Sequence, residues 1–535
     1  MTKPAGSKRR VRLGRLLPWL PALLVLLPLL TVIWRGMQPA GEAWAQIVEH
    51  RLGGHVWQSA VLVVSVTVLA MLMGVPAAWQ VSVNDFPGRR LFEWTLLLPL
   101  AMPGFVAAVT YVDLLGKLVP FYVWIRKTYG VEAFRAVQEI APWIFTVGVL
   151  AATLFPYVFL SCRAVFAKEA AGAIEAARML GAGRARAFFR VALPMARPAI
   201  AAGASLVAME TINDYGTVSA FGLTPLTPGV FRAWTEGSPQ AAMRLGLILM
   251  AMTLVFLALE RWQRGRRRFA SDPSETPLAR RRLGWGGAAW AWLVCLLPLA
   301  LGFLLPAWRL ARWTAQAHER MDWSGYWAAA GNSLWLSVAA AALIVLGAAV
   351  VVGGCRAYGG RPLQAAQRLS LLGYTLPSAL VAVGVGALMS TAATWRGLAF
   401  LALSASCAGL IFSYFVRFLA VGVQPLAAGL ERVSPSLHEA ARTLGASPLR
   451  ALAQVDLPLV RPALIAGATL AFMDVFKELT MTQVLRPFDF ETLSTLTYRL
   501  TSESRIPEAA VPGLFMVLIS LLGLIPLTRL LRRAR

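Results

Sequence analysis

The sequence predicts an all-α polytopic membrane protein with twelve transmembrane helices, arranged as two parallel repeats of six. Three observations support this fold class. The 535-residue chain is 58% hydrophobic and only 14% charged, with a mean hydropathy of +0.62, whereas soluble domains carry about 25% charged residues. The apolar residues gather into runs long enough to cross a bilayer. A polar, arginine-rich segment also occurs twice, once in each half of the chain.

The apolar runs divide evenly between the two halves. The first run, Leu16 to Trp34, follows a basic cluster and is about 19 residues long, so we expect a retained span rather than a cleaved signal peptide. The other spans expected in the first half lie near 57–79, 94–114, 141–162, 198–220 and 241–260. The spans expected in the second half lie near 287–308, 330–352, 369–390, 397–418, 462–484 and 510–530.

A basic, proline-containing linker separates the two halves. We therefore place the first half at residues 1–260, a cytoplasmic linker at 261–286 and the second half at 287–535. With the amino terminus inside the cell, about two-thirds of the Lys and Arg residues fall in cytoplasmic segments, as the positive-inside rule favours. Both termini are then cytoplasmic. Because each half has an even number of spans, the two copies insert the same way round.

The repeated polar segment has the same pattern in both halves, and each residue of the second copy lies 264 positions after its counterpart. A Glu-Ala-Ala sequence followed by Arg favours a short helix, and the Gly that comes after it favours the turn that ends the helix. Two near-identical copies in otherwise divergent halves indicate one kind of partner surface that is used twice. The residues of the pattern are Glu175, Ala176, Ala177 and Gly181 in the first copy, and Glu439, Ala440, Ala441 and Gly445 in the second.

This pattern, followed in each copy by Val, one residue, Leu and Pro (191–194 and 455–458), resembles the Glu-Ala-Ala loop of permease subunits in ATP-binding-cassette (ABC) importers. The resemblance implies that each loop presents a helix to one of two copies of a separate ATPase, which holds ATP and Mg. It also implies a periplasmic substrate-binding protein as donor and the bacterial inner membrane as location. The chain itself would bind no cofactor and would not be an enzyme.

Two expected spans each carry a pair of carboxylates at positions i and i+4, on one helix face: Glu210 with Asp214, and Asp474 with Glu478. Ionisable groups inside a bilayer are costly and mark either a transport pathway or a buried pair. As a pathway, the four acids would ligate a hard cation transiently, because such cations prefer oxygen ligands. As a structural feature, they would pair with Lys477, cap broken half-helices, or lie in the wet interface.

The segments around these acids (209–218, 231–234, 474–482 and 485–493) resemble fused permeases of ferric-iron ABC importers. This resemblance covers essentially the whole chain and implies Fe(III) as substrate. Fused permeases for thiamine share the layout, so a thiamine or other small-cation importer is the alternative within the class. An ion-coupled secondary transporter, which also favours six-plus-six repeats, is the alternative from another class. It would have no use for two ATPase-docking loops.

Several other functions find no support in the sequence. No Gly-x-x-x-x-Gly-Lys-Ser/Thr motif is present, so we do not expect the chain to hydrolyse ATP. The net charge of +25 comes from basic residues in the gaps between apolar runs. They do not form a face with interleaved aromatic residues, so we do not expect nucleic-acid binding. The four cysteines and four histidines have no metal-ligand spacing.

Overall fold

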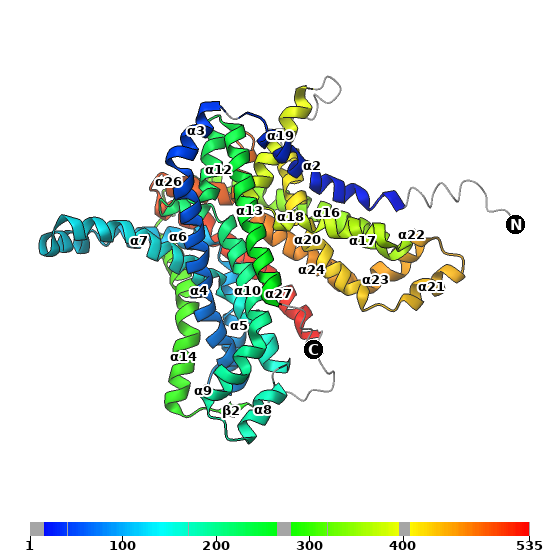
Figure 1. Cartoon of the computed structure of the whole chain (residues 1–535), viewed down its shortest axis with the longest axis horizontal. Coiled ribbons are helices and arrows are strands. Elements are labelled where there is room, and N and C mark those ends of the chain that lie inside the picture. The colour runs from blue at the N-terminus through cyan, green and yellow to red at the C-terminus, as the bar shows by residue number, and fades with distance from the viewer. Residues whose placement is uncertain are drawn as a thin grey trace.

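The protein is a helical bundle whose two halves diverge from one another (Figure 1). The computed structural model describes residues 15–39, 41–169, 171–264, 280–317, 319–394 and 407–533. The basic cluster before residue 15, residues 265–279 of the predicted linker and residues 397–406 of the tenth predicted span lie outside the described residues. In Figure 1 the first half runs down to α8 (Ala171–Met179), and the second half runs to the right, to α21 (Pro435–Thr443).

The helices of the first half follow the predicted spans, with short helices between them. They are, in chain order, α2 (Trp19–Gly36), α3 (Gly41–His50), α4 (Leu52–Val83), α5 (Arg89–Thr95), η1 (Leu98–Ala101), α6 (Gly104–Gly116), α7 (Val119–Ala164), η2 (Val165–Glu169), α8 (Ala171–Met179), α9 (Arg184–Ala187), η3 (Phe188–Ala192), α10 (Leu193–Asn213), α11 (Gly216–Ala220), α12 (Leu226–Thr235) and α13 (Pro239–Arg264).

The helices of the second half repeat this order from α16 onward. They are, in chain order, α14 (Trp285–Leu299), η4 (Ala300–Leu304), α15 (Leu305–Ala317), α16 (Trp323–Tyr358), α17 (Arg361–Ser370), α18 (Leu372–Thr375), α19 (Ser378–Thr394), α20 (Cys407–Glu431), α21 (Pro435–Thr443), α22 (Pro448–Ala451), η7 (Leu452–Asp456), α23 (Leu457–Leu459), α24 (Arg461–Phe476), α25 (Thr480–Leu485), α26 (Leu493–Ser502) and α27 (Ile506–Arg533).

The predicted twelve spans are reached when bent helix pairs are counted. Among the described residues, nine helices are long and apolar enough to cross a membrane, and three bent pairs bring the number to twelve. Two of the bent pairs are equivalent: α5–α6 bends by 86°, and α17–α19 by 109°. Pro103 and Pro377 stand at these bends, where proline removes a backbone hydrogen bond. The sequence predicts a span at each site but not its bend.

Two further predicted spans end earlier than expected. The spans placed at 198–220 and 462–484 are interrupted, because α10 ends at Asn213 and α24 at Phe476. The short helices α11 and α25 follow each break and are themselves followed by α12 and α26. In both halves, therefore, a short helix follows the long one, α11 after α10 and α25 after α24. Each short helix lies at the end of the long helix that is far from the Glu-Ala-Ala loop.

Terminal helices of each half pack against the other half. One hydrophobic core joins α4, α6 and α7 with α14, α15 and α27, and the other joins α16, α19, α20 and α24 with α2 and α13. Gly302 in η4 permits one of these approaches, because a Cβ there would lie 2.0 Å from the carbonyl oxygen of Ala152 in α7. Close contact at small residues is a main source of helix association in a bilayer. Each core is therefore built from both halves of the chain.

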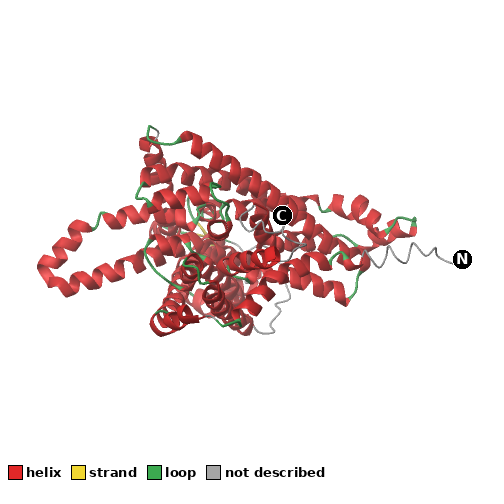
Figure 2. Ribbon diagram, turned by 90° about the horizontal axis from the view of Figure 1, so that it is seen from above, coloured by secondary structure: helices red, strands yellow, loops and turns green. Residues whose placement is uncertain are grey.

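The first part of α7 forms a helical arm that projects from the bundle (Figures 1 and 2). The arm turns back at Gly130, whose φ of 89° favours glycine. Its exposed side chains include Phe121, Trp124 and Tyr129. Between the matching prolines and the repeated loops, the first half is longer than the second. The arm contains most of these additional residues.

A short strand pair connects the end of the predicted linker to the first half. Strand β1 (Asn84–Asp85) pairs in parallel with β2 (Arg281–Arg282), with Asn84 opposite Arg281. The strand β1 directly follows α4. The backbone of the chain is therefore fastened to the first half immediately before α14 begins.

The second Glu-Ala-Ala loop is held in place by a polar triad around a buried aspartate. His438 Nδ1 lies 2.5 Å from Asp456 Oδ2, and Arg356 Nε lies 3.5 Å from Asp456 Oδ1. The Asp456 side chain is completely buried. The equivalent positions of the first half hold Ser82, Ile174 and Ala192, which are all buried as well. The same loop is thus fixed by a charged cluster in one half and by small or apolar residues in the other.

We expect Asp456→Ala to destabilise the second loop, because it leaves the buried His438 and the partly buried Arg356 without this partner. Removing one member of a buried charged pair costs about 3–5 kcal/mol. The triple variant Arg356→Ser/His438→Ile/Asp456→Ala copies the first half and should recover most of this loss. Thermal unfolding in detergent and limited proteolysis of residues 432–447 measure both. A triple variant less stable than Asp456→Ala would contradict the explanation.

Candidate functional site

The two Glu-Ala-Ala loops have the same backbone geometry. Helices α8 and α21 are each followed, two residues after their last residue, by a glycine with positive φ, 81° at Gly181 and 92° at Gly445. In the first loop the N–H of Ala182 donates to the carbonyl of Ala177 at 2.9 Å, and the equivalent bond of the second loop measures 3.1 Å. This is the Schellman arrangement, which satisfies the last carbonyls of a helix. The predicted short helix and glycine turn are therefore confirmed in both copies.

Each loop presents a large apolar side chain to solvent at its turn. Leu180 is 88% exposed and the equivalent Leu444 is 89% exposed. The opposite face of each helix is anchored, since Ile174 and His438 are buried. A single exposed leucine is common on a protein surface. Its recurrence at the same place in both halves, on a helix with an anchored back, fits one kind of partner surface that is used twice.

Asp214 and Glu478, which are equivalent in the two halves, cap the short helices that follow the broken spans. Asp214 accepts hydrogen bonds from the N–H groups of Thr217 and Val218, at 2.8 and 3.2 Å. Glu478 accepts from the N–H groups of Met481 and Thr482, at 2.9 and 3.1 Å. The first N–H groups of a helix have no partner inside it, and a carboxylate satisfies them well. One structural alternative predicted from the sequence is that the acids cap broken half-helices. The contacts of Asp214 and Glu478 are of this kind.

Glu210 and Asp474 lie one helical turn earlier and are not caps. Both are partly buried, and they lie close enough to interact electrostatically with each other. The hydroxyl of Tyr374, from the other half, donates to Glu210 at 3.4 Å. Tyr157 is also within electrostatic range of both carboxylates. The fold therefore brings one acid from each half to a shared polar centre between them.

Two reciprocal contacts join the halves beside this centre. The N–H of Ser378 donates to Asn213 Oδ1 at 3.2 Å, and Lys477 Nζ donates to the carbonyl of Leu100 at 3.4 Å. Asn213 and Lys477 are equivalent residues at the ends of α10 and α24, and both contact the bent span of the opposite half. Lys477 thus braces the second half against the first.

Arg417 is a functional candidate that the sequence analysis missed. It lies in α20, is 4% exposed, and donates to the carbonyl of Leu376. It also interacts electrostatically with Asp474 and Glu478. The equivalent residue of the first half is Thr153. A single arginine inside an otherwise apolar run was the available signal, because such a residue requires a nearby counter-charge.

The four carboxylates do not form one metal cage in this arrangement. Within the part of the chain that the structure describes, no three residues among His, Cys, Asp and Glu are placed to hold a metal ion together. Two of the four predicted acids are occupied as helix caps, and the other two lie within electrostatic range of each other and of Tyr374, with Arg417 also within range of Asp474.

Comparison with known proteins places these features in a family. The model of the family described as "Binding-protein-dependent transport system inner membrane component" matches residues 67–268 and 344–534. The Fe(3+)-transport system permease protein FbpB 2 of Haemophilus influenzae is 25% identical over 517 residues, covering 94% of this chain and 96% of that protein.

Two further relatives match less than half of the chain. The molybdenum transport system permease protein ModB of Escherichia coli is 28% identical over 221 residues, covering 38% of this chain and 92% of that protein. The sulfate transport system permease protein CysW of Synechocystis is 29% identical over 248 residues, covering 44% of this chain and 86% of that protein. Because the family model matches twice and one relative matches nearly end to end, this chain belongs to the family of binding-protein-dependent transport system inner membrane components, with two copies of the family's domain fused in one polypeptide.

Proposed function

We propose that this chain is the membrane-spanning subunit of an importer that carries Fe(III) into the cytoplasm. A periplasmic binding protein delivers the iron, and a separate ATPase, present in two copies, drives transport from the two Glu-Ala-Ala loops. The observation that carries this proposal is the pair of loops with identical Schellman turns and equally exposed leucines. Two equivalent surfaces on one chain fit two copies of one partner.

The choice of iron depends on the relative that matches over 94% of the chain. Relatives named for molybdate/tungstate and for sulfate, which are anions, match less than half of the chain. The polar centre supports a cation, because Glu210 and Asp474 are acids that do not cap a helix and hard cations prefer oxygen ligands. A thiamine or other small-cation importer is the second candidate, since the same acids suit any small cation. Family membership decides against an ion-coupled secondary transporter.

The proposed mechanism moves the halves against each other. Closure of the ATPase pair displaces α8 and α21, whose glycine turns pass the motion to α10 and α24. These two helices end at the polar centre, where they contact the bent spans of the opposite half. Movement at the loops therefore changes the contacts around Glu210 and Asp474, and access to the centre alternates between the two sides.

Within this mechanism, Glu210 and Asp474 are the proposed contacts for the passing ion. Asp214 and Glu478, the other two acids of the predicted set, shape the pathway by holding α11 and α25 in place and contact the ion only if a cap opens. Weak ligation by few groups suits a conducting site, because the ion must also leave it.

Labelling of single cysteines tests the proposed topology. A membrane-impermeant thiol reagent added outside should reach cysteines placed in 115–140, 309–327 and 485–508. It should not reach cysteines placed in 163–196, 261–286 and 419–460, because these segments carry the cytoplasmic basic residues. Labelling of 261–286 from outside would contradict the parallel arrangement of the two repeats.

Reversing the charge at both loops tests the ATPase-docking role. Glu175→Lys/Glu439→Lys should leave the chain in the membrane but reduce binding-protein-stimulated ATP hydrolysis and uptake to the level of vesicles without the permease. Gly445→Asp should act similarly, because a φ of 92° is strained for a residue with a Cβ. Glu49→Lys, on an exposed helix outside the loops, is the matched control. Transport at the wild-type rate by the double variant would show that these loops do not couple the ATPase to transport.

Neutralising the polar centre tests the proposed pathway. In proteoliposomes with the binding protein and ATPase, Glu210→Gln/Asp474→Asn should abolish uptake of radioactive iron, while the ATPase still binds. Each single change should do less, because one acid remains. As a contrast, Asp214→Ala should lower thermal stability by about 0.5–2 kcal/mol, the usual loss for a helix cap. If uptake is undiminished after all four acids are changed to amides, the acids have only a structural role and do not contact the passing ion.

A further inference from the structure

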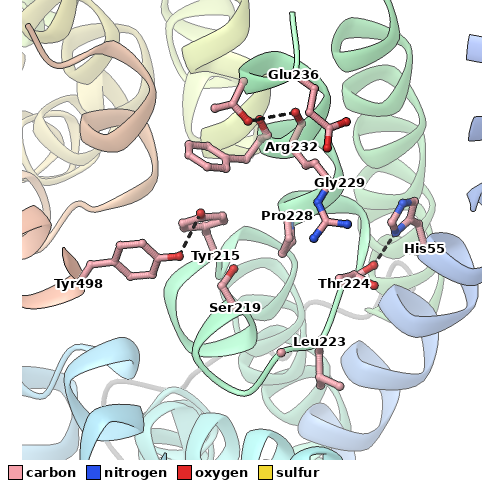
Figure 3. A pocket seen from close by; sticks show the side chains of 13 residues that line it. His55, Tyr215, Ser219, Leu223, Thr224, Pro228, Gly229, Arg232, Glu236 and Tyr498 are labelled. Atoms are coloured by element: carbon pink, nitrogen blue, oxygen red, sulfur yellow. Dashed lines mark hydrogen bonds between the residues drawn. The ribbon is translucent and has the colours of Figure 1, made fainter. Parts of the chain in front are cut away.

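A cavity of about 420 Å³ lies at the end of the first half that is far from its Glu-Ala-Ala loop. The 21-residue helix α10 separates the two places, a rise of about 30 Å. The cavity is lined mainly by the segment from Tyr215 to Glu236, with Tyr498 contributed by the second half (Figure 3). We call it the Arg232 cavity. Tyr215 and Tyr498 meet across it, with their hydroxyl oxygens 3.2 Å apart.

The second half contains an equivalent segment, which identifies the counterpart of each lining residue. The N–H of Leu226, which begins α12, donates to Ser59 Oγ at 2.8 Å. The N–H of Leu493, which begins α26, donates to Ser333 Oγ at 2.7 Å. These matching bonds place α12 on α26 with an offset of 267 residues. Arg232 is therefore the counterpart of Arg499.

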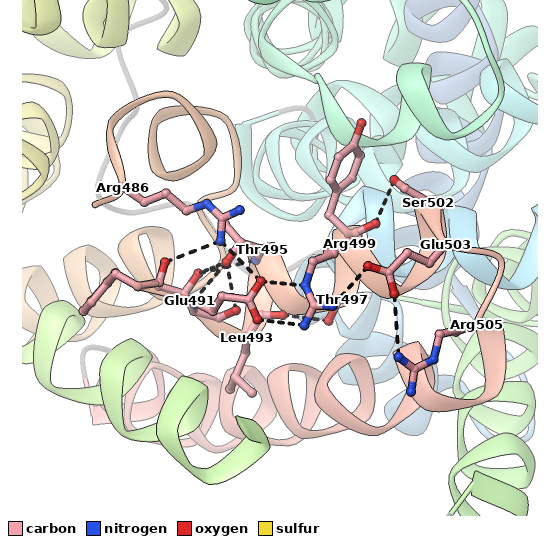
Figure 4. A network of polar contacts seen from close by, with 12 residues as sticks. Arg486, Glu491, Leu493, Thr495, Thr497, Arg499, Ser502, Glu503 and Arg505 are labelled. Atoms are coloured by element: carbon pink, nitrogen blue, oxygen red, sulfur yellow. Dashed lines mark hydrogen bonds and ion pairs between the residues drawn. The ribbon is translucent and has the colours of Figure 1, made fainter. Parts of the chain in front are cut away.

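In the second half this arginine is saturated by carboxylates (Figure 4). Arg499 Nε donates to Glu491 Oε1 at 2.7 Å, and its Nη2 donates to Oε2 of the same residue at 3.0 Å. Glu503 accepts a third bond from Arg499 at 3.1 Å. Although burial alone would raise the pKa of Glu491, the hydrogen bonds from Arg499 and Arg486 lower it. The two-bond contact is the geometry in which arginine binds a carboxylate most strongly.

In the first half the same arginine lacks this carboxylate. The counterpart of Glu491 is Thr224, and Arg232 forms no ion pair with any residue that the structure describes. In Figure 3 the guanidinium of Arg232 points toward Thr224, away from the carboxylate of Glu236. The cavity thus occupies the place where the second half has its own carboxylate.

Other polar groups line the same space. His55 is 7% exposed, and its Nδ1 lies 2.5 Å from the carbonyl oxygen of Thr224, so this nitrogen carries the proton. The two tyrosine hydroxyls and the hydroxyl of Ser219 are potential hydrogen-bond donors. Glu236 is the one carboxylate among the lining residues, and it limits the negative charge that the cavity accepts.

We propose that the Arg232 cavity is a binding site for a small anion that carries carboxylate groups, held by Arg232 as Glu491 is held by Arg499. A bound anion would contact both the first half and Tyr498 of the second half. It would therefore favour the conformation in which the two halves are in contact at the cavity. Under the proposed topology the site faces the periplasm. The proposal does not depend on iron as the substrate.

Binding of citrate to the full chain in lipid nanodiscs tests the proposal, without ATPase, binding protein or iron. Titration calorimetry should show one saturable site. Arg232→Gln should weaken citrate binding at least about tenfold, as expected from loss of a charged hydrogen-bond pair. Arg499→Gln, the matched change in the second half, should leave citrate binding unchanged.

Thr224→Glu is the decisive variant, because it copies the second half and places a carboxylate beside Arg232. It should abolish citrate binding, while the chain remains monodisperse in size-exclusion chromatography. Glu236→Gln should bind citrate more tightly than the wild type, because it removes a like charge from the cavity. Absence of saturable citrate binding by the folded wild-type chain would overturn the proposal. Undiminished binding by folded Thr224→Glu or Arg232→Gln would do so as well.

Discussion

The structure depends on how backbone polar groups are satisfied where spans five and eleven break inside the bundle. In a bilayer an unpaired N–H group costs several kcal/mol, so a helix can break only where other groups replace its hydrogen bonds. Asp214 and Glu478 supply these bonds at α11 and α25. The caps allow the chain to turn after α10 and α24. The segments after these turns form the Arg232 cavity in the first half and the Arg499 network in the second. Both features therefore depend on the two capping carboxylates.

The two halves keep one backbone plan while their chemistry differs at equivalent positions. A charged triad around Asp456 replaces apolar packing around Ile174, and Arg417 replaces Thr153. Fusion makes such differences possible, because each half occurs once and changes in one half are not copied into the other. The backbone plan is therefore shared by the two halves, whereas the charged residues around the polar centre and the lining of the cavity differ between them.

Exchange of helices between the halves limits how they can move. Because α2 and α13 pack in the core of the second half, and α14 and α27 in the core of the first, the halves cannot separate without breaking both cores. The contacts at the polar centre are weaker. Lys477 and Asn213 each make one hydrogen bond across the boundary, at 3.4 and 3.2 Å. Relative motion is therefore expected at the centre rather than in the hydrophobic cores.

The all-α membrane fold, the repeat, the two loops and the approximate places of the spans could all be predicted from the sequence. These follow from local composition and from patterns that recur at a fixed offset, so no distant contact is needed to find them. The bends at Pro103 and Pro377 and the exchange of helices depend on contacts between distant segments, and so does the division of four similar acids into two caps and two that lie within electrostatic range of each other. A carboxylate's role depends on which backbone or side-chain groups surround it, and those groups come from both halves of the chain. Spacing along one helix cannot show them.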